Sequence, residues 1–301
     1  MRLEGVFPPI TTPFTDGAVD AGKLAENIRR YERCGLAGYL LLGSTGEAAA
    51  LDEGEREVVL RAARAAVPRG RPLIAGVGME STAATVRTAR TAARCGADFV
   101  LVVTPFYFRS RMTEAALERH FATVADASPV PVLLYNVPMV TGVTIPPALV
   151  GTLAKHPNVL GLKDSSGDLT WLVDVFGRVP ESFSVLCGHA LAFQSGLAAG
   201  ACGGILAVAD VVPEPFVRLH ALHRSGDTSG ALLLQRRLVA TVRAFVDAYG
   251  VAGVKAAMDL RGLHGGDPRP PLLPASGPET EILRRRLEEC VAAGLIDGVG
   301  L

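Results

Sequence analysis

Arg94-Cys-Gly-Ala-Asp-Phe-Val-Leu-Val-Val103 holds the pattern that decides the fold: a helical stretch ends, a glycine follows, and a short apolar run begins. The same order recurs where Arg33-Cys34-Gly35 precedes residues 38–43 and where Ala199-Gly200 precedes residues 202–208. A glycine just past a helix accepts the left-handed conformation that satisfies the last carbonyls. The apolar runs are too short for helices and do not alternate, as expected of strands buried on both faces.

This pattern predicts eight strands alternating with helices. The strands are expected at 5–11, 38–43, 72–77, 99–103, 132–136, 159–163, 183–188 and 203–208. The helices between them are expected at 20–34, 52–66, 81–94, 112–126, 146–155, 168–177 and 190–199. Strands joined by helices pair in parallel. Eight such repeats, with no GxGxxG after the first strand, favour an α/β fold of the closed (β/α)8 barrel type over a doubly wound sheet.

The strand pattern stops at Pro213, and only helical patterns follow. They lie near 214–224, 227–248, 252–260 and 278–293, with a Gly/Pro-rich break at 262–277. We therefore predict a barrel over residues 1–212 and a C-terminal helical region over 213–301, packed on the barrel as one structural unit. A length of 301 residues is ordinary for a single barrel of this class.

Composition argues against several kinds of partner. The chain has 30 basic and 30 acidic residues and no long run of like charge, which argues against nucleic acid. It has neither 18 consecutive apolar residues nor the pattern of a signal peptide at its start. Its five cysteines show no paired spacing, which is typical of free thiols in a reducing compartment. We expect a cytoplasmic protein, away from membranes, that acts on a small molecule.

Lys163 is the most informative residue at the predicted barrel mouth, where the carboxyl ends of the strands converge. The chain has only four lysines, at 23, 155, 163 and 255, so the other 26 of its 30 basic residues are arginine. Lys163 ends a strand after an apolar run, and such a lysine loses hydration, which favours the neutral amine that attacks a carbonyl. Arginine cannot do this. The position of Lys163 alone also allows the alternative that it only forms an ion pair with the neighbouring Asp164.

Two neighbouring strand ends add to this hypothesis. Tyr135 ends the adjacent strand, and a phenol can both donate and accept the proton that imine formation requires. Gly43-Ser44-Thr45-Gly46-Glu47 ends the second strand, where a tight turn exposes N–H groups and hydroxyls that can hold a carboxylate. The alternative for Ser44 and Thr45 is that they only cap the turn.

Other residues at the mouth carry weaker signals. His189 follows the seventh strand, but no second His, Asp or Glu stands at ligand spacing, so we expect no metal. Cys187 is expected to face the mouth, although no base is paired with it. Asp164 and Glu47 are more consistent with orienting roles than with a catalytic carboxylate pair. No cofactor is expected besides a covalent imine on Lys163.

Five motifs in order resemble the dihydrodipicolinate synthase / N-acetylneuraminate lyase superfamily, and the resemblance spans essentially the whole chain. The motifs are Gly43-Ser-Thr-Gly-Glu47, Thr104-Pro105 with Tyr107, Tyr135-Asn-Val-Pro138, Gly161-Leu-Lys163 and Gly203-Gly-Ile205. The branch that looks most similar is 4-hydroxy-2-oxoglutarate aldolase. That similarity lies in 104–112, in Lys163-Asp-Ser165, and in 249–255 with Gly265-Gly266.

The resemblance implies a Schiff-base lyase with a (β/α)8 barrel, usually a homotetramer. Lys163 would form the imine with pyruvate or a substituted 2-oxo acid, and Tyr135 would be the acid/base. Ser44 would join a proton relay with Tyr135 and with Tyr107, which members of the family offer across a dimer interface. The residues implied to bind substrate, besides Ser44, are Thr45, Gly43, Ser165, Gly188 and Ile205.

One departure from the family pattern concerns the substrate. The synthases carry an arginine that holds the carboxylate of aspartate semialdehyde, and Val140 stands in its place. Losing such a partner costs about 2–5 kcal/mol unless another arginine, such as Arg109 or Arg111, replaces it. We therefore predict retro-aldol cleavage of 4-hydroxy-2-oxoglutarate, or a related 4-hydroxy-2-oxo acid, to pyruvate and an aldehyde.

Four alternatives remain beside this prediction. Two keep the Schiff-base chemistry: dihydrodipicolinate synthesis and cleavage of 2-keto-3-deoxy sugar acids. The third is a barrel that binds 2-oxo acids without turnover, and the fourth is a metal-dependent aldolase.

Overall fold

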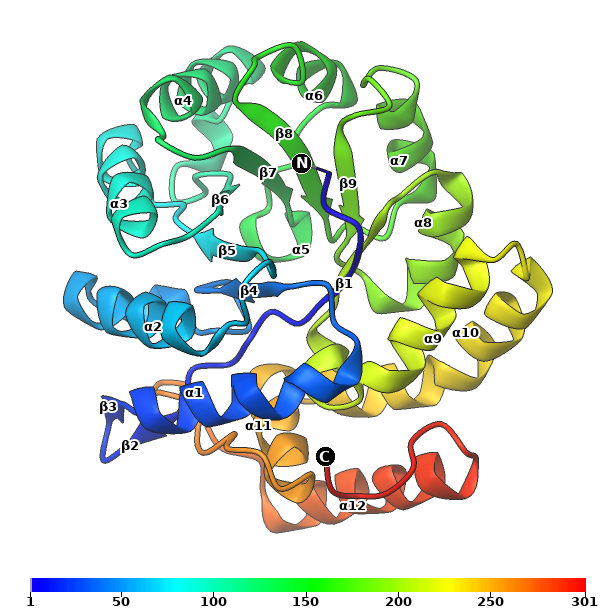
Figure 1. Cartoon of the computed structure of the whole chain (residues 1–301). Helices are drawn as coiled ribbons and strands as arrows, with labels where there is room; N and C mark the ends of the chain where they lie inside the picture. Colours follow the sequence, from blue (N-terminus) through cyan, green and yellow to red (C-terminus); the bar gives the residue numbers. More distant parts are fainter. Residues whose placement is uncertain (1) are drawn as a thin grey trace.

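Eight parallel strands surround the centre of the molecule in the computed structural model, which describes residues 2–301 (Figure 1). They are β1 (Gly5–Phe7), β4 (Tyr39–Leu41), β5 (Leu73–Gly76), β6 (Phe99–Val103), β7 (Val132–Asn136), β8 (Val159–Asp164), β9 (Ser184–Cys187) and β10 (Gly203–Ile205). Their order is β1-β10-β9-β8-β7-β6-β5-β4, and a parallel bridge from Pro9 to Leu40 joins the two ends. The predicted barrel and all eight predicted strands are confirmed.

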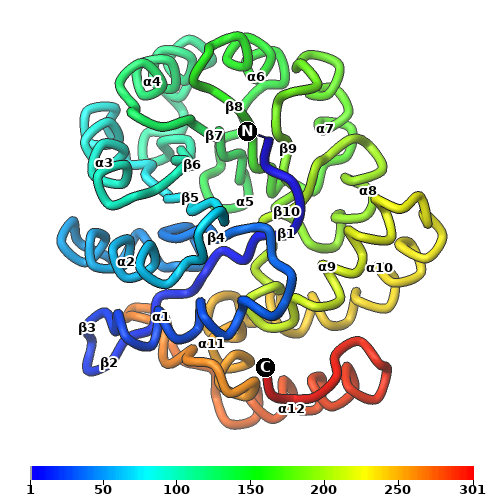
Figure 2. Tube along the Cα trace, viewed as in Figure 1, coloured from blue at the N-terminus to red at the C-terminus, as the bar shows by residue number. Residues whose placement is uncertain are grey.

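Helices form a ring outside the strands (Figure 2). The ring consists of α1 (Ala21–Arg30), α2 (Glu53–Ala66), α3 (Thr82–Arg94), α4 (Glu114–Ala127), α6 (Pro147–Leu153), α7 (Leu169–Phe176), α8 (Phe193–Ala199) and α9 (Pro213–Arg224). Several begin at a side chain that accepts a backbone N–H, as Asp52 does in a capping box with Glu55. Such caps satisfy amides that have no partner within the helix.

The strands are buried on both faces, which explains why their sequences do not alternate. In β6, Phe99 and Leu101 belong to a small cluster inside the barrel, whereas Val100 and Val102 pack with the larger core between strands and helices. The inner cluster also contains Tyr135 and Ile205. The barrel interior is therefore packed below its mouth, as is usual for this architecture.

The first of the C-terminal helices packs against α9, and the later ones extend the helical region beyond it (Figure 1). α10 (Thr228–Val242) continues into a π-helical turn, η6 (Arg243–Asp247), and α11 (Gly250–Leu260) and α12 (Gly277–Ala292) follow. The predicted helical extension is confirmed. The division of the chain at residue 212 stays a prediction, and α9 occupies the eighth position of the ring. Within residues 2–301, no helix combines the length and the apolar composition needed to cross a membrane.

Short elements account for the differences from the predicted pattern. A hairpin of β2 (Phe14–Thr15) and β3 (Ala18–Val19) turns through Asp16-Gly17, both with positive φ, and Asp-Gly is a usual signal of such a turn. One helical turn, α5 (Pro138–Thr141), follows β7 and is too short to show a helical period. Strand β1 ends before Pro8-Pro9, because prolines have no N–H to donate to a ladder.

Candidate active site

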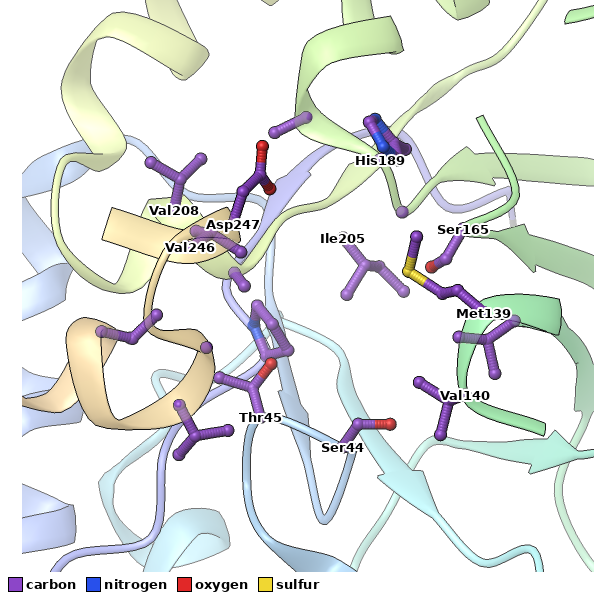
Figure 3. A pocket seen from close by; sticks show the side chains of 18 of the residues that line it. Ser44, Thr45, Met139, Val140, Ser165, His189, Ile205, Val208, Val246 and Asp247 are labelled. Carbon is purple, nitrogen blue, oxygen red and sulfur yellow. The ribbon is translucent and has the colours of Figure 1, made fainter. Parts of the chain in front are cut away.

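A cavity of about 280 Å³ opens at the carboxyl ends of the strands (Figure 3). Seven of the nine predicted site residues line it: Ser44, Thr45, Tyr135, Lys163, Ser165, Gly188 and Ile205. Gly43 and Tyr107 lie outside this lining. The strand ends thus bring together residues that are far apart in the sequence, as the barrel prediction required.

Lys163 and Tyr135 stand side by side in the cavity wall. They are register partners on the neighbouring strands β8 and β7, so the parallel pairing places them at the same level. Nζ of Lys163 lies 4.3 Å from the centroid of the Tyr135 ring. The two residues are 5% and 6% exposed. The Lys163 amino group and the Tyr135 phenol are therefore held together away from bulk water.

The environment of Tyr135 favours release of its proton. Burial acts to raise the pKa of the phenol, but the nearby Lys163 charge and polar interactions with Ser165, Ser44 and Lys163 outweigh it, so the pKa is lowered from its ordinary 10.0. An acid/base group works best when its pKa approaches the working pH. The shift therefore suits Tyr135 to proton transfer.

A buried polar link aligns the two strands just beyond this pair. Asn136 Nδ2 donates to Asp164 Oδ1 at 2.7 Å, and Ile145 N donates to Asn136 Oδ1 at 3.0 Å. The hydroxyl of Ser166 also donates to Asp164 at 2.8 Å. Burial nevertheless raises the pKa of Asp164 above its ordinary value. Asp164 thus orients the strand ends and makes no pair with Glu47.

The loop after β4 presents Ser44 and Thr45 to the cavity (Figure 3). Leu42 and Glu47, which bracket it, both have positive φ, at 59° and 54°. The Thr12 hydroxyl donates to the Gly46 carbonyl at 2.7 Å, and a Cβ on Gly46 would lie only 2.9 Å from the carbonyl oxygen of Ile10. Such backbone conformations persist only where the surroundings fix them, and they cluster at functional sites.

The opposite side of the cavity carries Ser165 and His189, with Asp247 at its edge (Figure 3). Gly188 also lines the cavity, and its lack of a side chain permits close packing there. A Cβ there would overlap the Ser165 hydroxyl and lie 3.0 Å from Lys163 Cε. Within residues 2–301, Nδ1 of His189 is buried without a hydrogen-bond partner. Polar groups therefore stand at both ends of a largely apolar cavity.

Tyr107 is an exposed residue that does not line the cavity of its own chain. It is 76% exposed, and its backbone N–H donates to Glu80 Oε2 at 2.8 Å. Phe108 beside it is 66% exposed. Its predicted part in a proton relay with Ser44 and Tyr135 is therefore not assembled within one chain.

One wall of the cavity was not predicted from the sequence. That wall comes from the C-terminal region and consists of Val242, Val246, Asp247, Gly250, Val251 and Val254. The π-helical turn η6 supplies two of these residues, and π-helical turns are frequent at functional sites. The segment 249–255, one of the stretches that carried the family resemblance, was the one available signal.

The expected orientation of Cys187 is wrong. The thiol packs against Gly196 of α8, where a Cβ would overlap its sulfur, and it does not line the cavity. Burial raises its pKa to about 12, which disfavours the nucleophilic thiolate. Among the described residues, no cluster of three His, Cys, Asp or Glu side chains is placed to hold a metal ion.

Asp210 is a second buried carboxyl near Lys163 that the sequence did not reveal. The residue is fully buried, and within residues 2–301 neither carboxyl oxygen has a well-formed hydrogen bond. Burial raises its pKa well above the ordinary 3.8, although the Lys163 charge and the Thr11 amide act in the opposite direction. At pH values above 3.8, the Asp210 carboxyl therefore keeps its proton in the folded protein, whereas it loses that proton in the unfolded chain.

We expect Asp210→Asn to stabilise the protein more as the pH rises. Above pH 3.8 the Asp210 carboxyl binds a proton more tightly in the folded state than in the unfolded state, so its contribution to stability falls as the pH rises, by up to about 1.4 kcal/mol per pH unit. Asparagine removes this loss. Thermal unfolding at pH 5, 6 and 7 should show a widening difference in Tm, whereas the exposed control Asp297→Asn should show none. An equal shift at every pH would contradict the prediction.

Comparison with known proteins places the chain in a family context. The pattern of the Dihydrodipicolinate synthetase family matches residues 2–290. A 4-hydroxy-tetrahydrodipicolinate synthase from an Exiguobacterium species is 36% identical over 287 residues, covering 95% of this chain and 97% of the relative. This relative carries the synthase name and not that of 4-hydroxy-2-oxoglutarate aldolase, the branch that the sequence alone favoured.

Solved structures agree in fold over nearly the whole chain. A dihydrodipicolinate synthase from Thermotoga maritima superposes with a TM-score of 0.92 at 31% identity, covering 98% of this chain and all of that one. A prophage protein of the dihydrodipicolinic acid synthase family from E. coli K12, solved in complex with pyruvate, superposes with a TM-score of 0.89 at 31% identity. It covers 95% of this chain and 98% of that one.

Proposed function

Because the chain belongs to the dihydrodipicolinate synthetase family and is a class I lyase of that family, we propose that Lys163 forms an imine with pyruvate or a substituted 2-oxo acid. The observation that carries this proposal is the buried pair of Lys163 and Tyr135 on adjacent strands, 4.3 Å from amine to ring centroid. Ser44 and Thr45 hold the substrate carboxylate, and Gly43 shapes their turn through its carbonyl, which accepts the Ala48 N–H at 3.3 Å.

The first half of the reaction uses Tyr135 as a proton carrier. The neutral amine of Lys163 attacks the 2-carbonyl, and Tyr135 protonates the oxygen that leaves as water. The resulting protonated imine withdraws electrons from C3. Loss of a C3 proton, or cleavage of the C3–C4 bond, then gives the same enamine. Ser165 and Gly188 line the space beyond C3, and Ile205 packs against the pyruvate end.

The relatives favour synthesis as the second half. In the synthase reaction the enamine carbon attacks the aldehyde of aspartate semialdehyde, and hydrolysis of the imine frees Lys163. The relative at 36% identity carries the synthase name. Arg109 lies near this end of the site, with Nη1 3.4 Å from the position of a Cβ on Gly142, in the turn that carries Val140. We propose Arg109 as the arginine that would meet the carboxylate of the aldehyde.

The cavity favours cleavage instead. Val140 lines it, and among the described residues no arginine does. Cleavage of 4-hydroxy-2-oxoglutarate needs Tyr135 to remove the C4 hydroxyl proton as the C3–C4 bond breaks, which leaves the enamine and glyoxylate. A cavity without a second fixed cation best suits the cleavage of a 2-keto-3-deoxy sugar acid, whose distal end is uncharged, whereas the second carboxylate of 4-hydroxy-2-oxoglutarate needs a neutral hydrogen-bond donor there.

A direct comparison of substrates tests the proposal. The purified protein is assayed with pyruvate plus aspartate semialdehyde, with 4-hydroxy-2-oxoglutarate, and with 2-keto-3-deoxy sugar acids, each with and without a chelator. Turnover of at least one substrate, insensitive to the chelator, is expected. Imine formation without turnover would identify a binding protein, and loss of activity with the chelator would point to a metal-dependent aldolase.

We expect Val140→Arg to favour the synthase reaction selectively. A guanidinium at this partly exposed position would raise kcat/KM for aspartate semialdehyde by about tenfold, since a charge-assisted bidentate contact is strong but loses strength to solvent here. Imine formation with pyruvate should not change. The matched variant Val140→Met adds length without charge. An equal gain with methionine would show that packing, and not charge, explains the effect.

We also propose that the chain assembles as a homotetramer in which a partner subunit provides Tyr107 to the cavity. Tyr107, Phe108, Met139 and Val140 are all more than half exposed and lie beside the mouth. Contiguous apolar surface of this kind usually marks an interface. Sedimentation should show a species larger than the monomer at assay concentrations, and a fully active monomer would overturn the proposal.

A cytoplasmic location and independence from metals complete the proposal. All five cysteines are free thiols, which suits a reducing compartment. The covalent imine supplies the electron sink for the reaction, so the proposed chemistry needs no additional cofactor.

A further inference from the structure

A buried ion pair lies behind the loop that presents Ser44 and Thr45. Nζ of Lys255 is 2.6 Å from Oε1 of Glu47, and the two side chains are 0% and 1% exposed. The contact is an ion pair and not a well-aligned hydrogen bond, but Lys255 also donates to the Asp267 carbonyl at 3.0 Å. Removing both charges from water is costly, so a pair in this position calls for an explanation.

Glu47 ends the loop itself, and its second carboxyl oxygen is also held. The backbone N–H of Arg269 donates to Glu47 Oε2 at 2.7 Å. The Arg269 guanidinium pairs with both carboxyl oxygens of Glu55, at 2.6 and 2.7 Å. Both cations also lie over the ring of Phe14, with Lys255 Nζ and Arg269 Cζ each 4.4 Å from its centroid. Lys255 and Arg269 of the C-terminal region thus hold the loop at Glu47, which does not line the cavity.

The helix that carries Lys255 also forms part of the cavity wall. Gly250, Val251 and Val254 of α11 line the cavity, and Lys255 is the next residue along the helix. One helix therefore touches both the space for the substrate and the base of the loop. A shift of α11 would move the wall and the loop together.

We propose that Lys255 is a positioning residue that holds the Ser44-Thr45 loop in its carboxylate-binding conformation through Glu47. Glu47 has a positive φ of 54°, a conformation that a non-glycine residue keeps only where its surroundings fix it. The ion pair fastens this residue from the far side. The inference rests on the proposed carboxylate-binding role of Ser44 and Thr45.

The ion pair can act on the stability of the fold and on the position of the loop, and measurements of stability alone would not distinguish these two roles. Breaking a buried pair by removing one partner strands a charge and destabilises the fold, whereas neutralising both partners often leaves stability unchanged. A double variant can therefore fold as the wild type does while lacking the ionic link between α11 and the loop. Its pyruvate dependence reports on positioning.

The experiment compares Lys255→Met, Glu47→Gln and the double variant Lys255→Met/Glu47→Gln with Lys23→Met as a matched control. Lys23 is 41% exposed at the start of α1, where it pairs with Asp20. Each protein is melted, and borohydride trapping is measured over a range of pyruvate concentrations. The midpoint, the pyruvate concentration that gives half-maximal trapping, should rise about tenfold in the double variant, which corresponds to the loss of one hydrogen bond to the charged carboxylate of pyruvate. The Tm of the double variant should stay near that of the wild type. Lys23→Met should match the wild type in both.

The outcomes distinguish this inference from the proposed function. If the wild type traps no pyruvate on Lys163, the proposed function fails. If the wild type traps pyruvate and a folded double variant traps it at the same midpoint, the positioning role is overturned. A raised midpoint together with an unchanged limiting rate of trapping at saturating pyruvate supports it, because a displaced loop weakens binding without changing the amine.

Discussion

Lys163→Ala is expected to lower kcat/KM by on the order of 10⁴-fold or more, because a covalent nucleophile has no substitute in the cavity. Lys163 is the one lysine that lines the cavity within the described residues. Incubation with pyruvate and borohydride, followed by intact mass and peptide mapping, should place one reduced pyruvate on Lys163 in the wild type. The variant should carry none.

The matched control for this loss is Lys23→Ala, which removes a lysine that is 41% exposed and paired with Asp20. It should keep full activity and the adduct on Lys163. The alanine variant should also keep its fold, since alanine leaves no unpaired charge behind. An adduct on another lysine, or substantial turnover by Lys163→Ala, would mean that the imine forms elsewhere.

The fold was predictable because each strand is read from local features. A glycine follows the helical stretch before β4, β6 and β10, and a run such as 99–103 is apolar at every position because both faces are buried. A parallel barrel then dictates that residues at the strand ends meet. The amino-acid sequence was therefore enough to place Lys163 beside Tyr135, and their register pairing confirms that geometry.

Features that depend on long-range packing were beyond this reasoning. The strand pattern located the end of β9 but not the direction of each side chain, so Cys187 was expected to face the mouth when it packs against α8. No local signal says which face of α11 closes the cavity, or that Lys255 meets Glu47. Asp210 was overlooked because burial of a carboxyl is a property of the whole fold.

In the proposed mechanism the proton transfers depend on Tyr135, and the pKa of its phenol makes this role testable. Burial raises this pKa, but the Lys163 charge and the polar interactions with Ser165, Ser44 and Lys163 outweigh burial and bring it below 10.0. If the protonated phenol is the working acid, wild-type kcat should fall as the pH rises through that pKa. This alkaline limb belongs to Tyr135 and should vanish with its hydroxyl.

Tyr135→Phe is therefore expected to lower kcat by about 10²- to 10⁴-fold, the usual contribution of a general acid/base, and to flatten the alkaline limb. Phenylalanine keeps the ring that packs in the barrel interior, so Tm should change little. Tyr39→Phe is the matched control, because Tyr39 is also buried and desolvation raises its pKa to about 12. The control should keep both rate and pH profile. Unchanged turnover in Tyr135→Phe would assign the proton transfers to another group, such as the Ser44 or Ser165 hydroxyl or a bound water.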